Sequence, residues 1–394
     1  MACQEYHAGM VEIVPRRVRL RLRLVASSVL MVVGLLAGLT PSAALAQADI
    51  DPPAAWTWER SEVPIAPAGI ELWDVTAGGP GFIAVGGGFT EGAQVATAVI
   101  WVSDDGRVWQ SVPLFGEAAS GVPRAIAATA DGYVAVGSGC CPDEAAVWLS
   151  PDGLSWQRLA DEPGFAGTAM LGVTATPDGV VAVGCSAVME CMGGLAWTSP
   201  DGLAWSEPVI LDMLPLGAAS TSAGVLALGS SQPYEGDAAL STSDDGVTWT
   251  ATTDLAVGGS LHAAVDMADG VLAVGGMIDL ERGDSEGLLA TSSDALSWEA
   301  QQSRRLRGVW LEDVAATDAG LLLIGWRASR GGQVPATLWT TDLSVFEPGA
   351  FPREVKMSGA LHGVALGEDG ATAVAVGWTI LNRGQAPTIW VSSG

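Results

Sequence analysis

The sequence predicts an all-β protein, a seven-bladed β-propeller of four-stranded antiparallel blades. Three observations lead to this fold class. A turn motif recurs at a nearly constant spacing, an apolar strand ending in glycine recurs seven times, and the two chain ends each resemble part of one blade. We expect an N-terminal strand at about residues 56–62 to complete the C-terminal blade and close the ring.

The turn motif reads Ser-x-Asp-Gly-x-x-Trp, and we expect it to join two antiparallel strands. Its closing aromatic residues lie 44 to 49 residues apart, a period typical of propellers and solenoids. Asp can accept hydrogen bonds from backbone N–H groups within a turn, and Gly adopts the positive φ that a tight hairpin needs. We therefore interpret these carboxylates as structural. They are Asp105, Asp152, Asp201, Asp245, Asp294 and Asp342, the last two in copies without the glycine.

The second landmark is an apolar strand that ends in glycine, and it counts the blades independently. The glycines are Gly86, Gly137, Gly184, Gly229, Gly275, Gly325 and Gly377. Each blade is then predicted to run through strand A, a tight turn, strand B up to its glycine, a variable B–C loop, strand C, the Asp turn and strand D. The B–C loops, among them 276–286, 326–335 and 378–386, share one face of the ring and form the candidate ligand face.

The chain ends carry complementary halves of a repeat. Trp56-Thr-Trp58-Glu-Arg60 matches the strand that follows each Asp turn, although no turn precedes it. Ile389-Trp390-Val391-Ser392 matches the strand before such a turn, and no turn follows. Pairing the two segments removes the exposed sheet edges of an open array, which favours a closed propeller over a solenoid.

The turn motif resembles the Asp-box (BNR) repeat of sialidase-like β-propellers, in a variant with one residue fewer between Asp and Gly. The resemblance covers nearly all of the chain after its leader and implies a propeller blade. As an activity it implies an exo-sialidase-type glycoside hydrolase, with an arginine cluster and a tyrosine nucleophile. Tyr234 is the one tyrosine in a predicted loop, and the Arg-Ile-Pro motif of the family is absent. The sialidase catalytic residues are therefore not evident.

The composition narrows the class of partner. The 394 residues carry a formal net charge of −26. Residues 1–48 hold five Arg and two Glu, so the remainder has 13 basic and 42 acidic residues and a charge of −29. Such a surface repels phosphate groups, which excludes nucleic acid and anionic membranes as expected partners. We expect a monomer that binds a protein or a glycan.

The N-terminus has the pattern of a secretory signal. Five arginines between residues 16 and 23 form a basic region, residues 24–39 are apolar, and Ala46-Gln-Ala48 is a small-x-small cleavage site. We predict a signal peptide at 1–48, a linker at 49–55 and the propeller at 56–394, and hence a secreted or extracytoplasmic protein. An uncleaved anchor, a start at Met10 and twin-arginine export remain alternatives.

One repeat position predicts the channel-facing residues. Counted back from the landmark glycines, strand A opens with Trp73, Arg124, Leu171, Leu216, His262, Glu312 and His362. The innermost strands begin beside the central channel, so these side chains are expected at its mouth. His262, Glu312 and His362 come from three consecutive blades and are a candidate divalent-metal set, with a polar channel lining as the alternative. We expect no other cofactor.

Two tryptophans follow their landmark glycines directly. Trp326 and Trp378 begin the B–C loops of adjacent blades, where an indole could stack on a sugar ring or a peptide side chain. Packing between blades is the alternative.

Four cysteines follow the leader, Cys140, Cys141, Cys185 and Cys191, and all lie in the B–C loops of two neighbouring blades. An even number in an exported chain predicts disulfides. Two bonds between blades, or Cys185–Cys191 with a free pair, remain open, as does a four-thiolate metal site.

These observations favour a secreted, non-catalytic β-propeller that binds a protein or a glycan through its B–C loop face. An exo-sialidase and an extracytoplasmic assembly scaffold are the alternatives.

Overall fold

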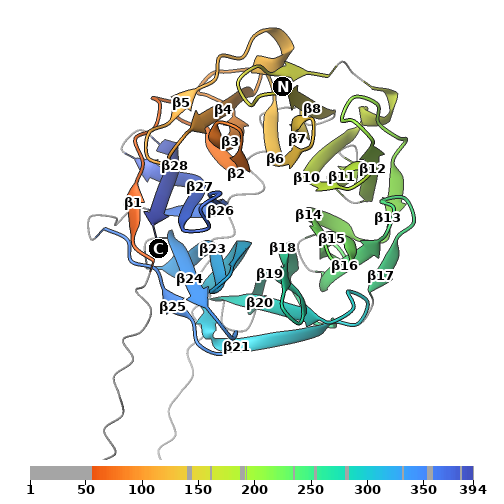
Figure 1. Ribbon diagram of the computed structural model, residues 1–394, viewed down its shortest axis with the longest axis vertical. Helices are drawn as coiled ribbons and strands as arrows, with labels where there is room; N and C mark the ends of the chain where they lie inside the picture. The colour runs from red at the N-terminus through yellow and green to blue at the C-terminus, as the bar shows by residue number, and fades with distance from the viewer. Residues whose placement is uncertain are drawn as a thin grey trace, which may run out of the picture.

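The computed structural model describes residues 56–394 apart from 140–143, 160–161, 187–190, 192, 234–235, 253–254, 280–283, 331, 353–357, 382–383 and 394. Seven four-stranded antiparallel sheets surround a common axis, as Figure 1 shows. The predicted fold class, an all-β propeller of seven blades, is confirmed. The predicted signal peptide and linker lie outside the described residues.

In six blades the strands follow one another in chain order from the central axis outward, and in the seventh the outermost strand comes from the N-terminus (Figure 1). Blade 1 has β2 (Glu71–Gly78), β3 (Gly81–Gly88), β4 (Thr97–Ser103) and β5 (Gln110–Ser111). Blade 2 has β6 (Val122–Thr129), β7 (Gly132–Ser138), β8 (Ala145–Ser150) and β9 (Gln157–Arg158). Blade 3 has β10 (Thr168–Thr176), β11 (Gly179–Ser186), β12 (Gly194–Ser199) and β13 (Val209–Leu211).

The remaining blades follow the same order. Blade 4 has β14 (Leu214–Thr221), β15 (Gly224–Ser230), β16 (Ala238–Ser243) and β17 (Thr250–Thr252). Blade 5 has β18 (Ser260–Met267), β19 (Gly270–Asp279), β20 (Asp284–Ser292) and β21 (Glu299–Arg307). Blade 6 has β22 (Val309–Thr317), β23 (Gly320–Ser329), β24 (Gly332–Thr340) and β25 (Glu347–Pro348). Blade 7 has β26 (Gly359–Leu366), β27 (Thr372–Leu381), β28 (Gly384–Ser393) and the N-terminal β1 (Trp58–Arg60).

Blade 7 closes the ring as the sequence predicts. The N-terminal strand β1 pairs antiparallel with β28, with Trp58 opposite Ser392 and Arg60 opposite Trp390. The Ser392 hydroxyl adds a hydrogen bond of 2.7 Å to the carbonyl oxygen of Thr57. Residues from the two ends of the chain therefore form one sheet.

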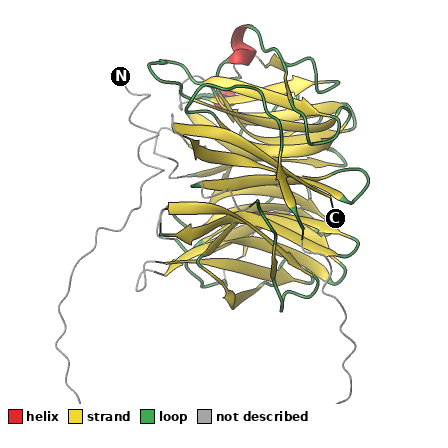
Figure 2. Cartoon of the chain, turned by 90° about the vertical axis from the view of Figure 1, so that its left-hand side faces the viewer, coloured by secondary structure: helices red, strands yellow, loops and turns green. Residues whose placement is uncertain are grey.

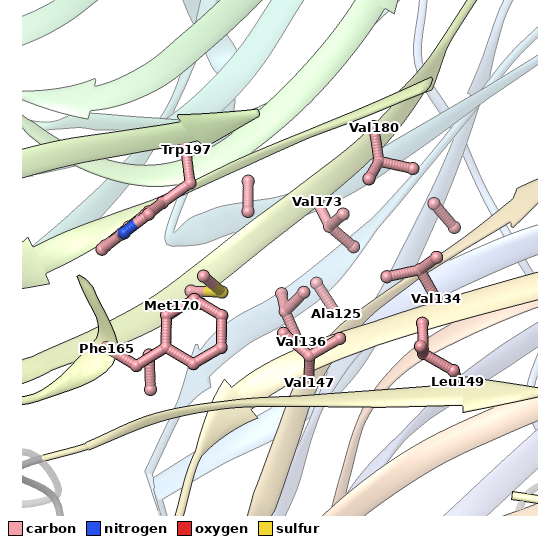
Figure 3. Close-up of a cluster of buried hydrophobic side chains, with 13 residues drawn as sticks. Ala125, Val134, Val136, Val147, Leu149, Phe165, Met170, Val173, Val180 and Trp197 are labelled. Carbon is pink, nitrogen blue, oxygen red and sulfur yellow. The ribbon is translucent and has the colours of Figure 1, made fainter. Parts of the chain in front are cut away.

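The core is distributed around the ring rather than gathered at its centre. Seven clusters of buried apolar side chains each lie between two neighbouring blades. Figure 3 shows the cluster between blades 2 and 3, where Val136 and Val147 face Met170 and Val173. In the side view of Figure 2 the strands of the stacked blades lie face to face. Since strands B and C are covered on both faces, their near-continuous apolar sequences are explained.

The Asp turns use the hydrogen bonds that their residue types favour. Asp152 Oδ1 accepts from the backbone N–H groups of Leu154 at 2.9 Å and Ser155 at 2.8 Å, and these donors lower the pKa of the carboxyl. The Trp156 indole donates to the carbonyl of Gly153 at 2.9 Å. In the two altered copies Ala295 and Leu343 keep the left-handed conformation, with φ of 55° and 60°. The turn therefore keeps its backbone conformation even where the glycine is replaced.

The predicted B–C loops of blades 5 to 7 are wrong, because these segments are mainly strand. The ladder between β19 and β20 continues to the pair Asp279–Asp284, that between β23 and β24 to Ser329–Gly332, and that between β27 and β28 to Leu381–Gly384. Strand B continues past the landmark glycine in these three blades instead of ending at it. Three consecutive blades thus carry longer hairpins on this face.

Two 3-10 turns, η1 (Gly116–Ala119) and η2 (Pro163–Phe165), complete the elements. In the described part of the chain no helix has the length and apolar character needed to span a membrane.

Candidate functional site

A β-bulge in each innermost strand marks the repeat position that the sequence singles out. In all seven blades the pairing of the first strand with the second shifts by one residue. The unpaired residues are Trp73, Arg124, Leu171, Leu216, His262, Glu312 and His362. A bulge redirects a side chain away from the regular alternation of a strand, and bulges are common beside functional sites.

The landmark glycines make these bulges sterically possible. A Cβ added at Gly184 would fall on the carbonyl oxygen of Ala169 and lie 2.8 Å from Met170 Cα, both in the neighbouring first strand. The same collision with the first strand occurs at the other six landmark glycines. Glycine is thus required here by the close approach of another backbone. The landmark glycine and the bulged residue therefore recur together in every blade.

Three bulged residues from consecutive blades form an aromatic and cationic stack. The rings of Trp73 and His362 stack with centroids 4.6 Å apart and an interplanar angle of 22°. The guanidinium carbon of Arg124 lies 3.7 Å from the centroid of the Trp73 ring, a cation–π contact. Blades 7, 1 and 2 are therefore linked through the side chains at one repeat position.

A second group joins blades 5 and 6. His262 Nδ1 lies 2.8 Å from Glu312 Oε2, and His262 Nε2 lies 2.7 Å from the hydroxyl of Ser260. The Trp310 ring meets the His262 ring edge-on at 5.5 Å and stacks on Trp326 at 5.7 Å with an angle of 9°. Both nitrogens of His262 are engaged by protein groups.

Three functional candidates were missed by the sequence reasoning. Glu71, Ser260 and Trp310 each stand two residues before the bulge of their blade, and so share a second repeat position. Glu71 accepts a hydrogen bond from the Gln385 side chain. A bulge interrupts the regular alternation of side chains along a strand, so a period of two counted from the bulged residue does not predict these contacts.

Burial and neighbouring charges shift the titration of this group. Burial raises the pKa of Glu71 from 4.5 to about 7, although the charge of Arg124 acts in the opposite direction. Burial lowers the pKa of Arg124 to about 10, and here the charge of Glu71 opposes the shift. Burial also lowers the pKa of His362, and the nearby charge of Arg124 adds to that effect. For Glu312 burial acts upward, but the charge and hydrogen bond of His262 and a hydrogen bond from Trp326 leave the pKa lowered. These shifts favour the charged form of the Glu312 carboxyl and the uncharged form of the His362 imidazole.

Two more carboxylates follow bulged residues directly and connect blades. Asp74 accepts from the backbone N–H of Ile126 in blade 2 at 2.9 Å, and Asp313 from that of Val364 in blade 7 at 2.8 Å. Burial raises the pKa of Asp74 to about 7 and that of Asp313 to about 8. Their bonds between blades point to a structural role.

The ring of bulged residues has two chemically different sides. Polar and aromatic side chains at the bulges and two residues before them occupy blades 5, 6, 7, 1 and 2. The corresponding bulged residues of blades 3 and 4 are Leu171 and Leu216. We call this ring of seven bulged residues, with Glu71, Ser260 and Trp310, the mouth ring.

The metal hypothesis for His262, Glu312 and His362 stays a prediction. Among the described residues no group of three or more His, Cys, Asp or Glu side chains is arranged to hold a metal ion. His262 and Glu312 are paired with each other, whereas the His362 ring lies against Trp73. A polar channel lining stays the alternative prediction.

Trp326 and Trp378 lie in strands and not in loops, which corrects their predicted placement. Trp326 pairs with Trp310 on one side and Pro335 on the other, and Trp378 with Ala360 and Pro387. Trp326 packs on an indole of its own blade. Neither tryptophan starts a flexible loop.

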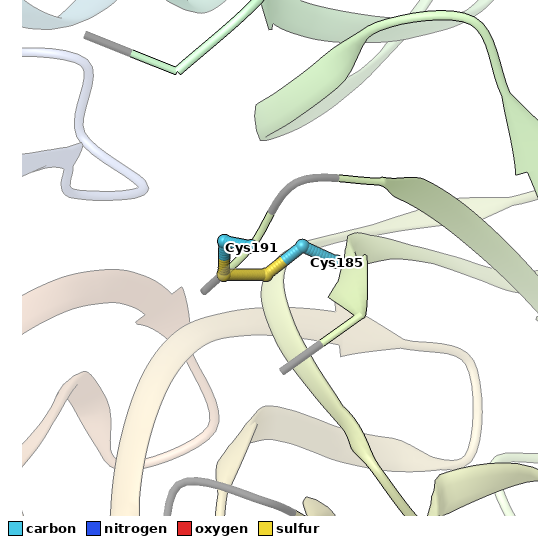
Figure 4. The surroundings of a disulfide bond; sticks show 2 residues. All are labelled: Cys185 and Cys191. Carbon is cyan, nitrogen blue, oxygen red and sulfur yellow. A yellow bond between two sulfur atoms is a disulfide. The ribbon is translucent and has the colours of Figure 1, made fainter. Parts of the chain in front are cut away.

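Cys185 and Cys191 form a disulfide with Cα atoms 4.9 Å apart, at the end of β11 and in the segment that follows it (Figure 4). This is one of the two pairings that the sequence leaves open. Cys140, Cys141 and Tyr234 lie outside the described residues. Disulfides persist in oxidising compartments, so this bond is typical of an extracytoplasmic protein.

Comparison with solved structures identifies the same fold in several proteins. The chain is similar to YCF48 bound to D1 peptide, with 16% identity over 85% of this chain and 96% of that chain and a TM-score of 0.55. For the Kuenenia stuttgartiensis hydrazine synthase the values are 10%, 83% and 97%, with a TM-score of 0.51. For the Trypanosoma rangeli sialidase they are 11%, 85% and 59%, with a TM-score of 0.47. At these identities the likeness shows the fold alone. No protein-family model matches the chain, and no curated protein matches it.

Proposed function

We propose that this protein is a secreted binding propeller whose mouth ring takes a segment of another protein. The observation that carries the proposal is the convergence of side chains from all seven blades at one bulged position. They offer a guanidinium, a carboxyl, two imidazoles and an indole on one side and two leucines on the other. A polypeptide presents both hydrogen-bonding groups and apolar side chains, and so can use both sides.

A protein segment suits the mouth ring better than a sugar. Binding to a sugar face needs an indole face that is free. Trp73 is in contact with both His362 and Arg124, and Trp310 and Trp326 stack on each other. These contacts already occupy indole faces, whereas the polar edges and the leucines remain for peptide groups.

Two further observations support the proposal. The similar fold of YCF48 is seen bound to D1 peptide, so a propeller of this shape can take a peptide. The disulfide and the leader sequence fit an extracytoplasmic location. The hydrogen-bonded turns support their assignment as shortened Asp-boxes, which makes the exo-sialidase the alternative from the same superfamily.

The test is a peptide selection with matched variants. Residues 49–394 are panned against a displayed library of random peptides, and the affinities of enriched peptides are measured by calorimetry. We expect Arg124→Ala and Leu216→Ala to weaken binding by at least about tenfold, the loss of 1.4 kcal/mol typical of an interface anchor. Leu203→Ala is the control, since Leu203 is exposed in an Asp turn on the opposite face.

Parallel assays decide between the alternatives. A glycan array and a fluorogenic sialoside are tested with the same protein. Enrichment of glycans without peptides, or peptide affinities that the two mouth variants leave unchanged, would overturn the proposal. Sialoside turnover that disappears in Tyr234→Phe would establish the hydrolase instead.

A further inference from the structure

Three side chains of the mouth ring, Ser260, His262 and Glu312, are linked by two successive hydrogen bonds. The proposed binding role does not depend on these bonds. The Ser260 hydroxyl lies 2.7 Å from His262 Nε2, and His262 Nδ1 lies 2.8 Å from Glu312 Oε2. A hydroxyl, an imidazole and a carboxylate in this order form the relay by which enzymes activate a serine.

The repeat explains how the chain builds this relay. Ser260 opens β18, and the bulge two residues later places the His262 ring against the Ser260 hydroxyl. Glu312 occupies the bulge of the next blade and faces His262 across the blade junction. The three groups are therefore fixed by strands of the ring and not by a loop.

The hydrogen bonds define a role for each group. The reactive form pairs a Glu312 carboxylate with a neutral His262 imidazole, whose Nδ1 lies 2.8 Å from Glu312 Oε2. An ionised carboxylate can only accept, so Nδ1 carries the hydrogen and Nε2 accepts from the Ser260 hydroxyl. This is the tautomer in which the imidazole can remove the serine proton.

We propose that Ser260 is an activated nucleophile and that the mouth ring transfers acyl groups from small esters. Ser260 Oγ attacks the ester carbonyl carbon while its proton passes to His262 Nε2. The carbon–oxygen bond to the alcohol breaks, and the alcohol leaves with that proton. Water then attacks the acyl carbon while one of its protons passes to His262 Nε2; the bond from that carbon to Ser260 Oγ breaks, Oγ takes the proton back from His262, and the carboxylic acid is released.

The surroundings of Ser260 limit the acyl group to a short one. The residue is only 8% exposed. The Trp310 ring meets the His262 ring edge-on, with centroids 5.5 Å apart. Gly276 pairs with Ser260 in β19, and the Trp310 ring lies so close to Gly276 that a Cβ there would collide with it. We therefore expect acetyl esters to react and long-chain esters to be excluded. This activity goes beyond the proposed binding role and departs from the expectation of a non-catalytic protein.

The decisive experiment maps a covalent adduct. Residues 49–394 are treated with a small fluorophosphonate, whose fluoride Ser Oγ displaces at phosphorus, and the modified peptide is identified by mass spectrometry. We expect one adduct, on Ser260, which is absent from Ser260→Ala and strongly reduced in His262→Ala. Ser241→Ala is the matched control, because Ser241 is also a buried strand serine and its hydroxyl meets Met213 instead of a histidine.

Turnover of p-nitrophenyl acetate gives the second readout. Lys356 is the only lysine, so background acetylation of amines is small. We expect Ser260→Ala and His262→Ala to lower the rate by roughly 10²-fold or more, the lower range for a positioned general base, and Glu312→Gln to lower it with the fold unchanged by circular dichroism. No adduct at Ser260, or an undiminished rate in Ser260→Ala, would overturn the proposal.

Discussion

Trp73 and His362 stack with ring centroids 4.6 Å apart, across the junction between the first blade and the last. Blade 7, which supplies His362, is also the blade that the two chain ends complete. The mouth ring and the closure of the propeller are therefore physically connected. A change at either one is expected to reach the other.

Replacing Trp73 by Ala should raise the pKa of His362 toward its ordinary value. Burial is the largest cause of its lowered pKa, and loss of the indole admits water to one face of the imidazole. The measurement is an NMR titration of the histidine ring protons in residues 49–394, where His262 and His362 are the two histidines. His362→Gln assigns the resonance. An unchanged titration in Trp73→Ala would show that the stack does not bury His362.

Replacing Gly184 by Ala should destabilise the protein by about 3 kcal/mol, the upper end of the usual overpacking cost. The added Cβ meets the backbone of Ala169 and Met170, which cannot move without breaking the bulge at Leu171. Gly193→Ala is the control in the same blade, because a Cβ at Gly193 has no neighbour within 4 Å. Urea unfolding measures both. Equal midpoints for the two variants would contradict the steric explanation of the landmark glycines.

Periodicity predicts positions better than contacts, and the mouth ring shows why. The spacing from each landmark glycine located all seven bulged residues, because the close approach of two backbones recurs in every blade. Glu71 and Ser260 were not found. Their repeat position is apolar in other blades, as at Val122 and Leu214, so it carries no recurring polar signal.

The sequence does not predict which side chains pair or where the strands end, and the reasons are related. His262 was grouped with Glu312 and His362 by position, but rotamers and neighbours decide that it pairs with Glu312 and Ser260. The sequence predicts loops where blades 5 to 7 have hairpins, because a glycine within a strand and a glycine at a strand end look the same in a sequence. A sequence repeat predicts the backbone positions that recur in every blade, but not the side-chain contacts that differ between blades.

Replacing Glu71 by Gln should flatten the fall in stability between about pH 5 and pH 7. The pKa of Glu71 is raised from 4.5 to about 7, so the folded state binds its proton more tightly than the unfolded state. Stability from this group is complete below the unfolded pKa and is lost as pH rises through the folded pKa. At 1.36 kcal/mol per pKa unit the loss is at most about 3.4 kcal/mol.

Urea unfolding at pH 5 and pH 7.5 measures the effect in Glu71→Gln. Gln keeps an oxygen that can accept from Gln385. Glu299→Gln, on the outermost strand of blade 5, removes the same formal charge at an exposed site. If both variants show the same pH dependence, overall charge and not the burial of Glu71 sets the slope.

Removing the disulfide by the double replacement of Cys185 and Cys191 with Ala should cost about 2 kcal/mol, the loop-entropy value for a short closed loop. The buried position of Cys185 suits the smaller side chain without a new polar group. Unfolding with and without dithiothreitol is compared for both chains. Reduction should lower the midpoint of the wild type and leave that of the variant unchanged. Four free thiols in the untreated wild type would contradict the bond.

Starting the chain at residue 63 should open the ring and cause self-association. The truncation removes β1, and with it the fully buried Trp58, whose loss alone costs about 3–5 kcal/mol by the scale of core Trp→Ala changes. It also leaves β28, ten residues long, as an unpaired sheet edge that can pair with another chain. Light scattering should show oligomers, and a synthetic peptide of residues 56–62 should restore the monomer, whereas a scrambled peptide should not. A truncated chain that stays monomeric with the wild-type unfolding midpoint would mean that blade 7 is complete without its N-terminal strand, and the link between closure and the Trp73–His362 stack would lose its basis.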